Sequence, residues 1–199
     1  MGAGGPSCAC ATHAAGHRLD LAVNLSARQL ADPGLADDVE RAIVTSGIDP
    51  GSLVLEVTET ALMEDPDRAL ATLQRLRRIG ARIAVDDFGT GYCSLSYLSA
   101  FPVQILKVDA AFVARMTTNQ QDRTIVAAVI GLAHALGIMA LGEGVESESQ
   151  LEMLSELGCD AVQGFLLGVP LPGPELLRRL EAPVPVEATG RSWSSSSLG

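Results

Sequence analysis

The sequence predicts an α/β protein in which parallel strands are covered by helices. Three observations support this prediction. Short apolar runs alternate with helical stretches along the chain, polar residues stand at the carboxyl end of each run, and 47% of the residues are hydrophobic. A chain of 199 residues is long enough to bury the core that one such domain needs.

The first two strands are predicted within residues 19–60. A short apolar run over residues 19–26 ends in polar residues, and a helical stretch follows it as far as about Ser46. The second run, over residues 52–60, carries two carboxylates near its end. Strand and helix therefore alternate from the start of the folded region.

A helix with signals at both ends is predicted next. Asp65 is suited to cap its start, Pro66 to occupy its first position, and Gly80 to end it. Helical spacing marks its apolar face, which carries Leu70, Leu73 and Leu76. The third strand is then predicted over residues 81–87, within the stretch "AVDDFGTGY".

The second half of the chain supplies three further strands. A long helix over roughly residues 120–136 precedes one of them. Ser147 and Gln150 have capping-box spacing and predict the start of another helix, which Gly158 ends. The three strands are predicted over residues 103–109, 137–146 and 159–165.

Both ends of the chain differ in composition from its centre. Residues 1–18 are small and rich in Gly and Ala, and residues 183–199 are rich in Pro and then in Ser. We therefore predict a disordered leader and tail around one domain over residues 19–182. The leader also contains four residues that suggest a zinc site, but a Cys-x-Cys without a second ordered pair is weak support for one. They are Cys8, Cys10, His13 and His17.

Charge and cysteine content exclude several classes of function. The formal net charge of -10 argues against general binding to DNA, RNA or anionic membranes, which reward clusters of Lys and Arg. The four cysteines have no disulfide-framework spacing, which favours a reducing, cytoplasmic setting. The longest strongly apolar run, residues 125–133, is too short to span a bilayer.

Polar residues gather at the carboxyl ends of the predicted strands. In a parallel barrel these ends meet on one face, where catalytic residues lie. Carboxylate and amide oxygens suit Mg²⁺ or Mn²⁺, two such ions suit attack of water on a phosphate ester, and a lysine offsets phosphoryl charge. Each residue taken alone has a structural alternative, such as a helix cap or a surface charge. The set comprises Asn24, Glu56, Glu59, Asp86, Asp87, Lys107, Asp109, Glu143, Glu146 and Gln163.

Six motifs, in order and with compatible spacing, resemble those of the EAL-domain cyclic di-GMP phosphodiesterases. The resemblance covers roughly residues 19–180 and implies a TIM-like (β/α) barrel that takes part in bacterial second-messenger signalling. It implies hydrolysis of cyclic di-GMP to linear pGpG by water that Mg²⁺ or Mn²⁺ activates. The motifs are "VNLSARQL" (23–30), "LEVTET" (55–60), "VDDFGTGYCSLSYL" (85–98), "LKVD" (106–109), "GEGVES" (142–147) and "QGFLLGVPLP" (163–172).

The same resemblance implies roles for individual residues. Asp87 corresponds to the residue associated with a second metal ion and its water, Glu143 to the general base, and Lys107 to the lysine beside the attacking water. Glu59 corresponds to a residue that orders the loop after the "DDFG" strand, a loop that also takes part in homodimer contacts. The metal ligands correspond to Asn24, Glu56 and Asp86, and the supporting positions to Asp109, Glu146 and Gln163.

One family motif has no counterpart in this sequence. The Glu-Ala-Leu strand, which supplies a further metal ligand and is followed by a phosphate-binding arginine, does not occur upstream of Asn24. We therefore expect about six of the eight barrel strands, two open sheet edges, weaker binding of metal and substrate, and much slower hydrolysis than in a complete domain. The alternative to a phosphodiesterase is an inactive remnant that binds cyclic di-GMP or a partner protein.

Overall fold

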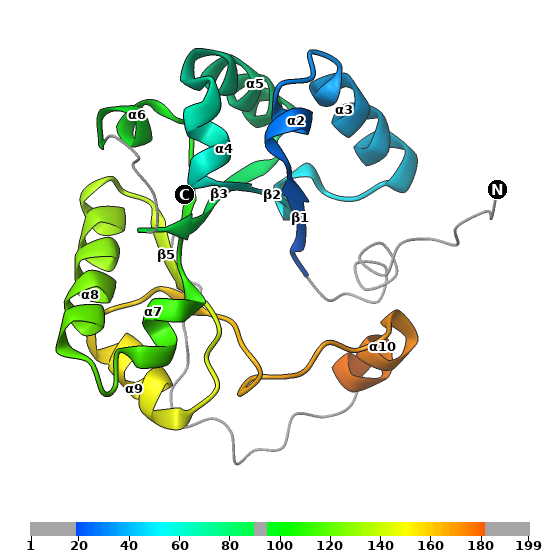
Figure 1. Ribbon diagram of the computed structural model, residues 1–199. Coiled ribbons are helices and arrows are strands. Elements are labelled where there is room, and N and C mark those ends of the chain that lie inside the picture. Colours follow the sequence, from blue (N-terminus) through cyan, green and yellow to red (C-terminus); the bar gives the residue numbers. More distant parts are fainter. Residues whose placement is uncertain (1–18, 90–94, 182–199) are drawn as a thin grey trace.

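The computed structural model describes residues 19–89 and 95–181 of the chain (Figure 1). Within these residues the strands form one six-stranded sheet in sequence order, and every neighbouring pair is parallel. The predicted α/β class, with parallel strands and helices in alternation, is confirmed. The strands are β1 (Leu21–Leu25), β2 (Leu53–Thr58), β3 (Arg82–Phe88), β4 (Ile105–Val108), β5 (Met139–Gly142) and β6 (Ala161–Val162).

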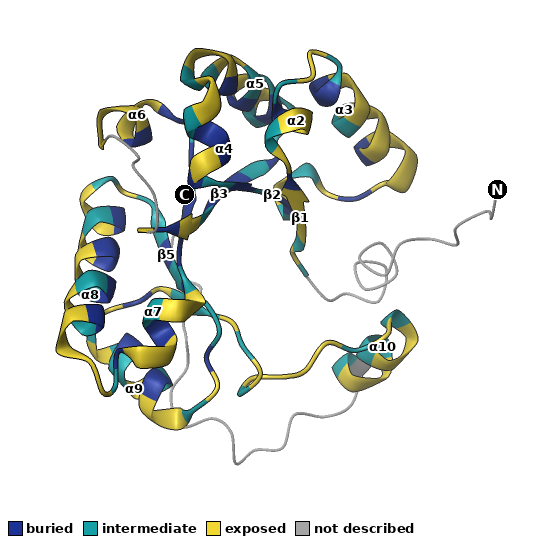
Figure 2. Ribbon diagram, viewed as in Figure 1, coloured by how far each residue is buried: buried dark blue, intermediate teal, exposed yellow. Residues whose placement is uncertain are grey.

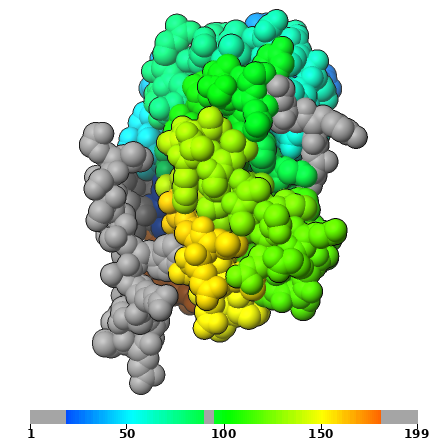
Figure 3. Space-filling model, turned by 90° about the vertical axis from the view of Figure 1, so that its left-hand side faces the viewer, coloured from blue at the N-terminus to red at the C-terminus, as the bar shows by residue number. Residues whose placement is uncertain are grey.

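The sheet is curved, and most of the helices pack around its outer side (Figure 1). Figure 3 shows part of this outer layer, where residues 120–135 lie beside residues 148–156. Arg123 of the first segment reaches to within 3.9 Å of Glu156 of the second. The helices are α2 (Ala27–Leu30), α3 (Leu35–Ser46), η1 (Pro50–Ser52), α4 (Glu59–Glu64), α5 (Pro66–Ile79), α6 (Leu95–Ala100), α7 (Ala110–Arg115), α8 (Gln120–Ala135), α9 (Glu148–Glu156) and α10 (Gly173–Glu181). None of the helices in the described ranges is long and apolar enough to cross a membrane.

The two faces of the sheet differ in chemistry because side chains alternate along each strand. The face toward the helices carries the main core, which includes Leu55, Val57, Ile83, Val85, Leu106 and Val108 (Figure 2). The inner face carries a smaller apolar cluster formed by Val54, Ala84 and Ile105. Two residues further along the same three strands stand Glu56, Asp86 and Lys107. The inner face of the sheet is therefore apolar at Val54, Ala84 and Ile105 and carries a charged layer, formed by Glu56, Asp86 and Lys107, nearer its carboxyl end.

Several local signals in the sequence are confirmed. Asp65 caps α5, since its Oδ1 accepts a hydrogen bond from Arg68 N at 3.2 Å, and Pro66 begins the helix. Gly80 ends that helix in the left-handed conformation. Ser147 and Gln150 form the expected capping box at the start of α9.

The predicted second strand is too long at its end. We expected it to run through residue 60 with Glu59 on it, but β2 ends at Thr58 and Glu59 begins α4. The cause is local: Thr58 Oγ1 accepts a hydrogen bond from Ala61 N at 3.3 Å and so caps a helix. Short helices that follow a strand directly, such as α4 and α7, lack the length at which periodicity becomes visible.

The described sheet has two edges, β1 and β6, as expected from the sequence. In β1 the three central residues, Ala22, Val23 and Asn24, are exposed. The predicted leader (1–18) and tail (183–199) lie outside the described residues, and so do the leader residues with zinc-ligand spacing, Cys8, Cys10, His13 and His17.

Candidate active site

Lys107 lies at the centre of the charged layer. Its Nζ is 2.8 Å from Glu56 Oε1, 3.1 Å from Asp86 Oδ1 and 2.7 Å from Glu143 Oε1. These carboxylates come from β2, from β3 and from the residue after β5, so parallel strands bring together groups that are distant in sequence. The lysine side chain is only 3% exposed. The convergence that the sequence predicted for these four residues is confirmed.

The contacts of Lys107 decide its charge. Burial by itself lowers the pKa of the ammonium, but hydrogen bonds to Glu143 and Glu56 more than offset this effect, and the pKa lies above its ordinary value. Lys107 is therefore charged at neutral pH. It offsets one unit of the negative charge that Glu56, Asp86 and Glu143 bring to the acidic layer.

Asp86 and Asp87 end β3 in an unusual conformation. Asp87 has a φ of 54°, in the left-handed region that non-glycine residues rarely adopt, and its N donates to Asp86 Oδ1 at 3.0 Å. Burial, then the charges of Asp86 and Asp109, raise the pKa of Asp87, and Lys107 opposes them. The protein thus holds like charges together on a strained backbone, which is a common feature of functional sites.

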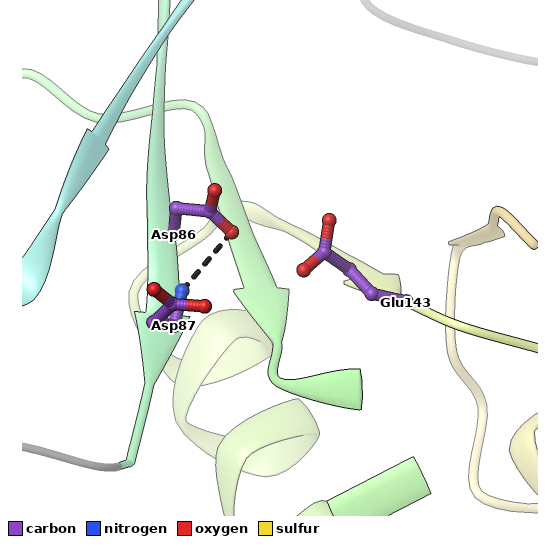
Figure 4. A group of neighbouring side chains, drawn as sticks. All are labelled: Asp86, Asp87 and Glu143. Carbon is purple, nitrogen blue, oxygen red and sulfur yellow. Dashed lines mark hydrogen bonds between the residues drawn. The ribbon is translucent and has the colours of Figure 1, made fainter. Parts of the chain in front are cut away.

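One oxygen from each of Asp86, Asp87 and Glu143 can be chosen so that all three lie within 4.8 Å of one another. Figure 4 shows the Asp86 and Glu143 carboxylates facing the space between β3 and the segment after β5. Hard divalent cations prefer such carboxylate oxygens, and Lys107 offsets only part of the negative charge. The residues present therefore fit a divalent metal ion.

Glu143 has the most perturbed carboxyl group of the cluster. Burial raises its pKa, the hydrogen bond and charge of Lys107 lower it, and Asp86 raises it again, with a net pKa of about 7. Gln163 Nε2 donates a hydrogen bond to Glu143 Oε1 at 2.5 Å. A carboxyl group that titrates near neutrality and is held in one orientation is suited to accept a proton from water.

The remaining predicted residues surround this cluster. Asn24 lies on β1 directly opposite Glu56, on the same face, and is exposed. Glu59 is buried, and its Oε2 accepts a hydrogen bond from Gly89 N at 3.2 Å. Gly89 has a φ of 101°, which explains a glycine where the chain leaves the Asp86–Asp87 pair.

Asp109 and Glu146 occupy positions that also have structural functions. Asp109 Oδ1 accepts a hydrogen bond from Ala111 N at 2.6 Å and caps α7. Glu146 is exposed, and its backbone N donates to Gln150 Oε1 at 2.7 Å, beside the start of α9. The negative charge of Asp109 raises the pKa of Asp87 and so affects the site. The backbone contact of Glu146 is instead with Gln150, a residue of the α9 capping box.

A backbone contact that the sequence did not predict holds Gln163 in place. Val145 N donates to Gln163 O at 3.0 Å, and Leu166 N donates to Val145 O at 3.0 Å. A Cβ on Gly164 would lie 2.2 Å from the N and O of Val145, so only glycine permits this approach. The Gln-Gly pair is the available signal, since a glycine next to a candidate polar group indicates a close backbone contact.

Comparisons with known proteins agree with this geometry. A family model described as "EAL domain" matches residues 8–170. The chain is 45% identical over 158 residues to the protein named bifunctional diguanylate cyclase/cyclic di-GMP phosphodiesterase MucR, from Pseudomonas aeruginosa. That match covers 79% of this chain and 23% of the relative, so the chain spans about a quarter of the relative's length.

Solved structures show the same similarity. The structure described as PaMucR phosphodiesterase in complex with c-di-GMP has a TM-score of 0.82 and 42% sequence identity, and the match covers 85% of this chain and 69% of that chain. A manganese and cyclic-di-GMP complex of Klebsiella pneumoniae BlrP1 has a TM-score of 0.72 and 33% identity, over 80% of this chain and 41% of that chain.

Proposed function

This chain belongs to the EAL domain family, and we propose that it is a phosphodiesterase domain that hydrolyses cyclic di-GMP to linear pGpG. One observation carries the proposal: Glu56, Asp86 and Glu143 converge on the buried Lys107 at the carboxyl end of a parallel sheet. The names of MucR and of its solved complex, which specify a cyclic di-GMP phosphodiesterase and a c-di-GMP complex, support it.

In this proposal Asn24, Glu56, Asp86 and Asp87 hold Mg²⁺ or Mn²⁺. A bound divalent ion would supply Lewis-acid activation of water and of the phosphodiester group. The left-handed conformation of Asp87 keeps its carboxylate beside that of Asp86 before any ion arrives, which reduces the reorganisation needed for binding. The manganese complex of BlrP1 supports a divalent ion in a related domain.

Glu143 is the proposed general base. At neutral pH its pKa of about 7 leaves part of the population deprotonated and ready to take a proton from the attacking water. The bond between the water oxygen and phosphorus forms, and the bond from phosphorus to one ribose oxygen breaks and opens the ring. The released ribose oxygen takes up a proton, so a terminal phosphate and a hydroxyl group are the products.

Lys107 and Gln163 are proposed to support this step. The Lys107 ammonium, held by hydrogen bonds to Glu56 and Glu143, places positive charge where negative charge develops on the phosphoryl oxygens. The hydrogen bond from Gln163 fixes the Glu143 carboxylate so that its orientation does not change during proton transfer. Asp109 and Glu146 are proposed as supporting residues at the edge of the site.

The second candidate, an inactive remnant that binds cyclic di-GMP or a partner protein, is not favoured. Burying several carboxylates around a lysine is costly for a fold that needs only stability, and related proteins carry the name phosphodiesterase. Homodimer contacts through the loop after the "DDFG" strand, and domain limits at residues 19 and 182, remain predictions.

The proposal is tested by following cyclic di-GMP and pGpG chromatographically after incubation with the purified chain and Mn²⁺. We expect pGpG to accumulate, and Glu143→Gln to slow its formation by about 10²–10⁴-fold because the base is lost. Glu152→Gln, the same change at an exposed position on α9, is the matched control and retains the rate. Intact cyclic di-GMP with the unaltered chain at saturating Mn²⁺ would overturn the proposal.

A further inference from the structure

The end of β3 is irregular where it carries the Asp86–Asp87 pair. Val85 pairs with Leu106 and Phe88 pairs with Val108, so β3 advances three residues where β4 advances two. One extra residue of this kind bends the strand and re-aims its side chains, as in a β-bulge. The second aspartate of the pair has a φ of 54°. A strained conformation like this persists only where the surrounding contacts hold it.

The residue that leaves this irregularity, Gly89, is contacted by two different elements. Its backbone N donates a hydrogen bond to Glu59 Oε2 of α4 at 3.2 Å. Apolar side chains of α7 and α8 lie against its Cα: a Cβ on Gly89 would lie 3.3 Å from Phe112 Cε2 and 3.9 Å from methyl carbons of Ile125 and Val129. The Phe112 ring therefore packs directly against the backbone of Gly89.

The Phe112 ring is itself held in place by a neighbour on α7. The Arg115 guanidinium carbon lies 5.9 Å from the centroid of the ring, within the range of a cation–π interaction. Arg115 Nε and Nη2 donate to the Asp122 carboxylate at 2.8 and 3.2 Å. Asp122 is buried in the first turn of α8, which lies beside α7 (Figure 1). The ring is thus fixed between two helices and does not depend on the metal site for its position.

We propose that Phe112 is a positioning residue for Asp87: by packing against Gly89, it keeps the Asp87 carboxylate beside that of Asp86. This inference rests on the proposed function, because it takes the divalent ion of that function as the ligand. Phe112 carries no group that binds an ion, so it acts only through the backbone. Without the ring, Gly89 gains room to move and the strained φ of Asp87 relaxes.

The affinity for metal is expected to report this role. When only a fraction of the molecules holds the binding conformation, the apparent Kd rises by the inverse of that fraction. Release of the strain at Asp87 is expected to raise the Kd for Mn²⁺ by roughly 5- to 150-fold, which corresponds to about 1–3 kcal/mol. Titration calorimetry of the full chain with Mn²⁺ alone measures the Kd of Phe112→Ala and of the unaltered chain.

Two further variants separate this effect from a general loss of packing. Phe112→Leu keeps part of the apolar contact and is expected to raise the Kd less than Phe112→Ala. Ile43→Ala, in the core beneath α3, also removes buried apolar atoms and is the matched control, with the Kd of the unaltered chain. Equal Kd values for Phe112→Ala and Ile43→Ala would overturn the proposal.

A double-mutant cycle tests whether Phe112 acts through Asp87. Asp87→Asn removes the carboxylate that the ring is proposed to position. We expect Phe112→Ala to raise the Kd for Mn²⁺ clearly in the unaltered chain and by less than about twofold in the Asp87→Asn chain, because coupled residues are not additive. The same factor in both chains would contradict a role through Asp87.

Hydrogen exchange in EDTA gives a readout that needs no metal. The Gly89 amide, which is bonded to Glu59, is expected to exchange faster in Phe112→Ala than in Ile43→Ala. If Phe112→Ala does not fold, Phe112→Leu is expected to show the same changes in a smaller size. Gly89 exchange that is no faster in either Phe112 variant than in the control would overturn the proposal.

The two proposals fail in different ways. An unchanged Kd in Phe112→Ala, together with pGpG formation by the unaltered chain, overturns the positioning role and leaves the proposed function intact. A raised Kd in Phe112→Ala without any hydrolysis by the unaltered chain supports the positioning role and overturns the phosphodiesterase proposal.

Discussion

The Nζ of Lys107 lies 2.7 Å from Oε1 of Glu143, and the same Oε1 accepts a hydrogen bond from Gln163 at 2.5 Å. One carboxylate oxygen therefore receives donors from β4 and from the residue after β6. Lys107 stands two residues after Ile105 on β4, so this one strand contributes both to the apolar cluster of the inner face and to the charged layer. The predictions below depend on this cluster and on the backbone that holds it.

Removal of the lysine charge is expected to destabilise the metal-free protein. In Lys107→Met the carboxylates of Glu56, Asp86 and Glu143 lose their cation, and breaking a buried ion pair lowers the free energy of unfolding by about 3–5 kcal/mol. Urea unfolding in EDTA measures the loss. Mn²⁺ is expected to restore more stability to this variant than to the unaltered chain, since it replaces the missing charge.

Arg123→Met is the control for that experiment. The side chain of Arg123 is 40% exposed and lies 3.9 Å from Glu156, so its removal is expected to change the free energy of unfolding by less than about 0.5 kcal/mol. Equal stabilities of Lys107→Met and Arg123→Met would show that the cluster at Lys107 carries no net charge to neutralise.

Asp87→Asn is expected to stabilise the metal-free protein and to weaken its response to metal. The pKa of Asp87 is raised by burial and by Asp86 and Asp109, so its ionised form is disfavoured in the folded state and stability falls as pH rises through its titration. The asparagine removes this repulsion. We expect a higher melting temperature in EDTA at pH 7 and a smaller rise on addition of Mn²⁺. A lower melting temperature in EDTA would contradict the account of this residue.

Acid sensitivity is expected from a pair outside the site. Arg115 Nε donates to Asp122 Oδ2 at 2.8 Å, and this bond lowers the pKa of Asp122 below its ordinary value. The folded state therefore binds the proton less readily, so the stabilisation is present above about pH 4 and is lost as pH falls through the folded pKa. The urea midpoint of Asp122→Asn is expected to fall below that of the unaltered chain at pH 7 and to approach it below pH 4.

Asp67→Asn, at an exposed position on α5, serves as the matched control for acid sensitivity. Its difference from the unaltered chain is expected to remain small across the whole pH range. A difference for Asp122→Asn that persists unchanged at pH 3 would disprove the assignment of this sensitivity to the Arg115 pair.

Gly164→Ala is expected to damage both stability and activity. The new Cβ would lie 2.2 Å from backbone atoms of Val145, which cannot move aside as a flexible side chain does. Overpacking of this kind costs about 1–3 kcal/mol, and the displaced turn takes Gln163 away from Glu143. Gly168→Ala has open space around its Cβ and is the matched control. The account fails here if both substitutions leave the pGpG formation rate unchanged.

The sequence predicted most of the sheet because alternating strands and capped helices leave local signals. The two ends of α5 are marked in the sequence by Asp65 and Pro66 at its start and by Gly80 at its end. These signals are local and do not depend on contacts with other segments. The charged layer was also predictable, since Glu56, Asp86 and Lys107 each stand at the carboxyl end of an apolar run. Parallel packing alone then brings them together.

Other features depend on contacts between distant segments and left no local signal. Glu59 lies in α4 because the Thr58 side chain caps that helix. The sequence pattern at this point does not distinguish the end of a strand from the start of a short helix. The left-handed conformation of Asp87 could not be predicted from its residue type, because this backbone conformation normally favours glycine. The approach of Gly164 to Val145 exists only once β5 and β6 are paired.

Hydrolysis in ¹⁸O-labelled water tests the central claim most directly. Cyclic di-GMP is incubated with the full chain and Mn²⁺ in labelled water, and the nucleotides are analysed by mass spectrometry. The proposed site predicts linear pGpG with ¹⁸O in its terminal phosphate, no product in EDTA, and formation slowed by about 10²–10⁴-fold with Glu143→Gln. Cyclic di-GMP that stays intact, or pGpG that carries no label, would contradict a metal-dependent attack of water at the cluster around Lys107.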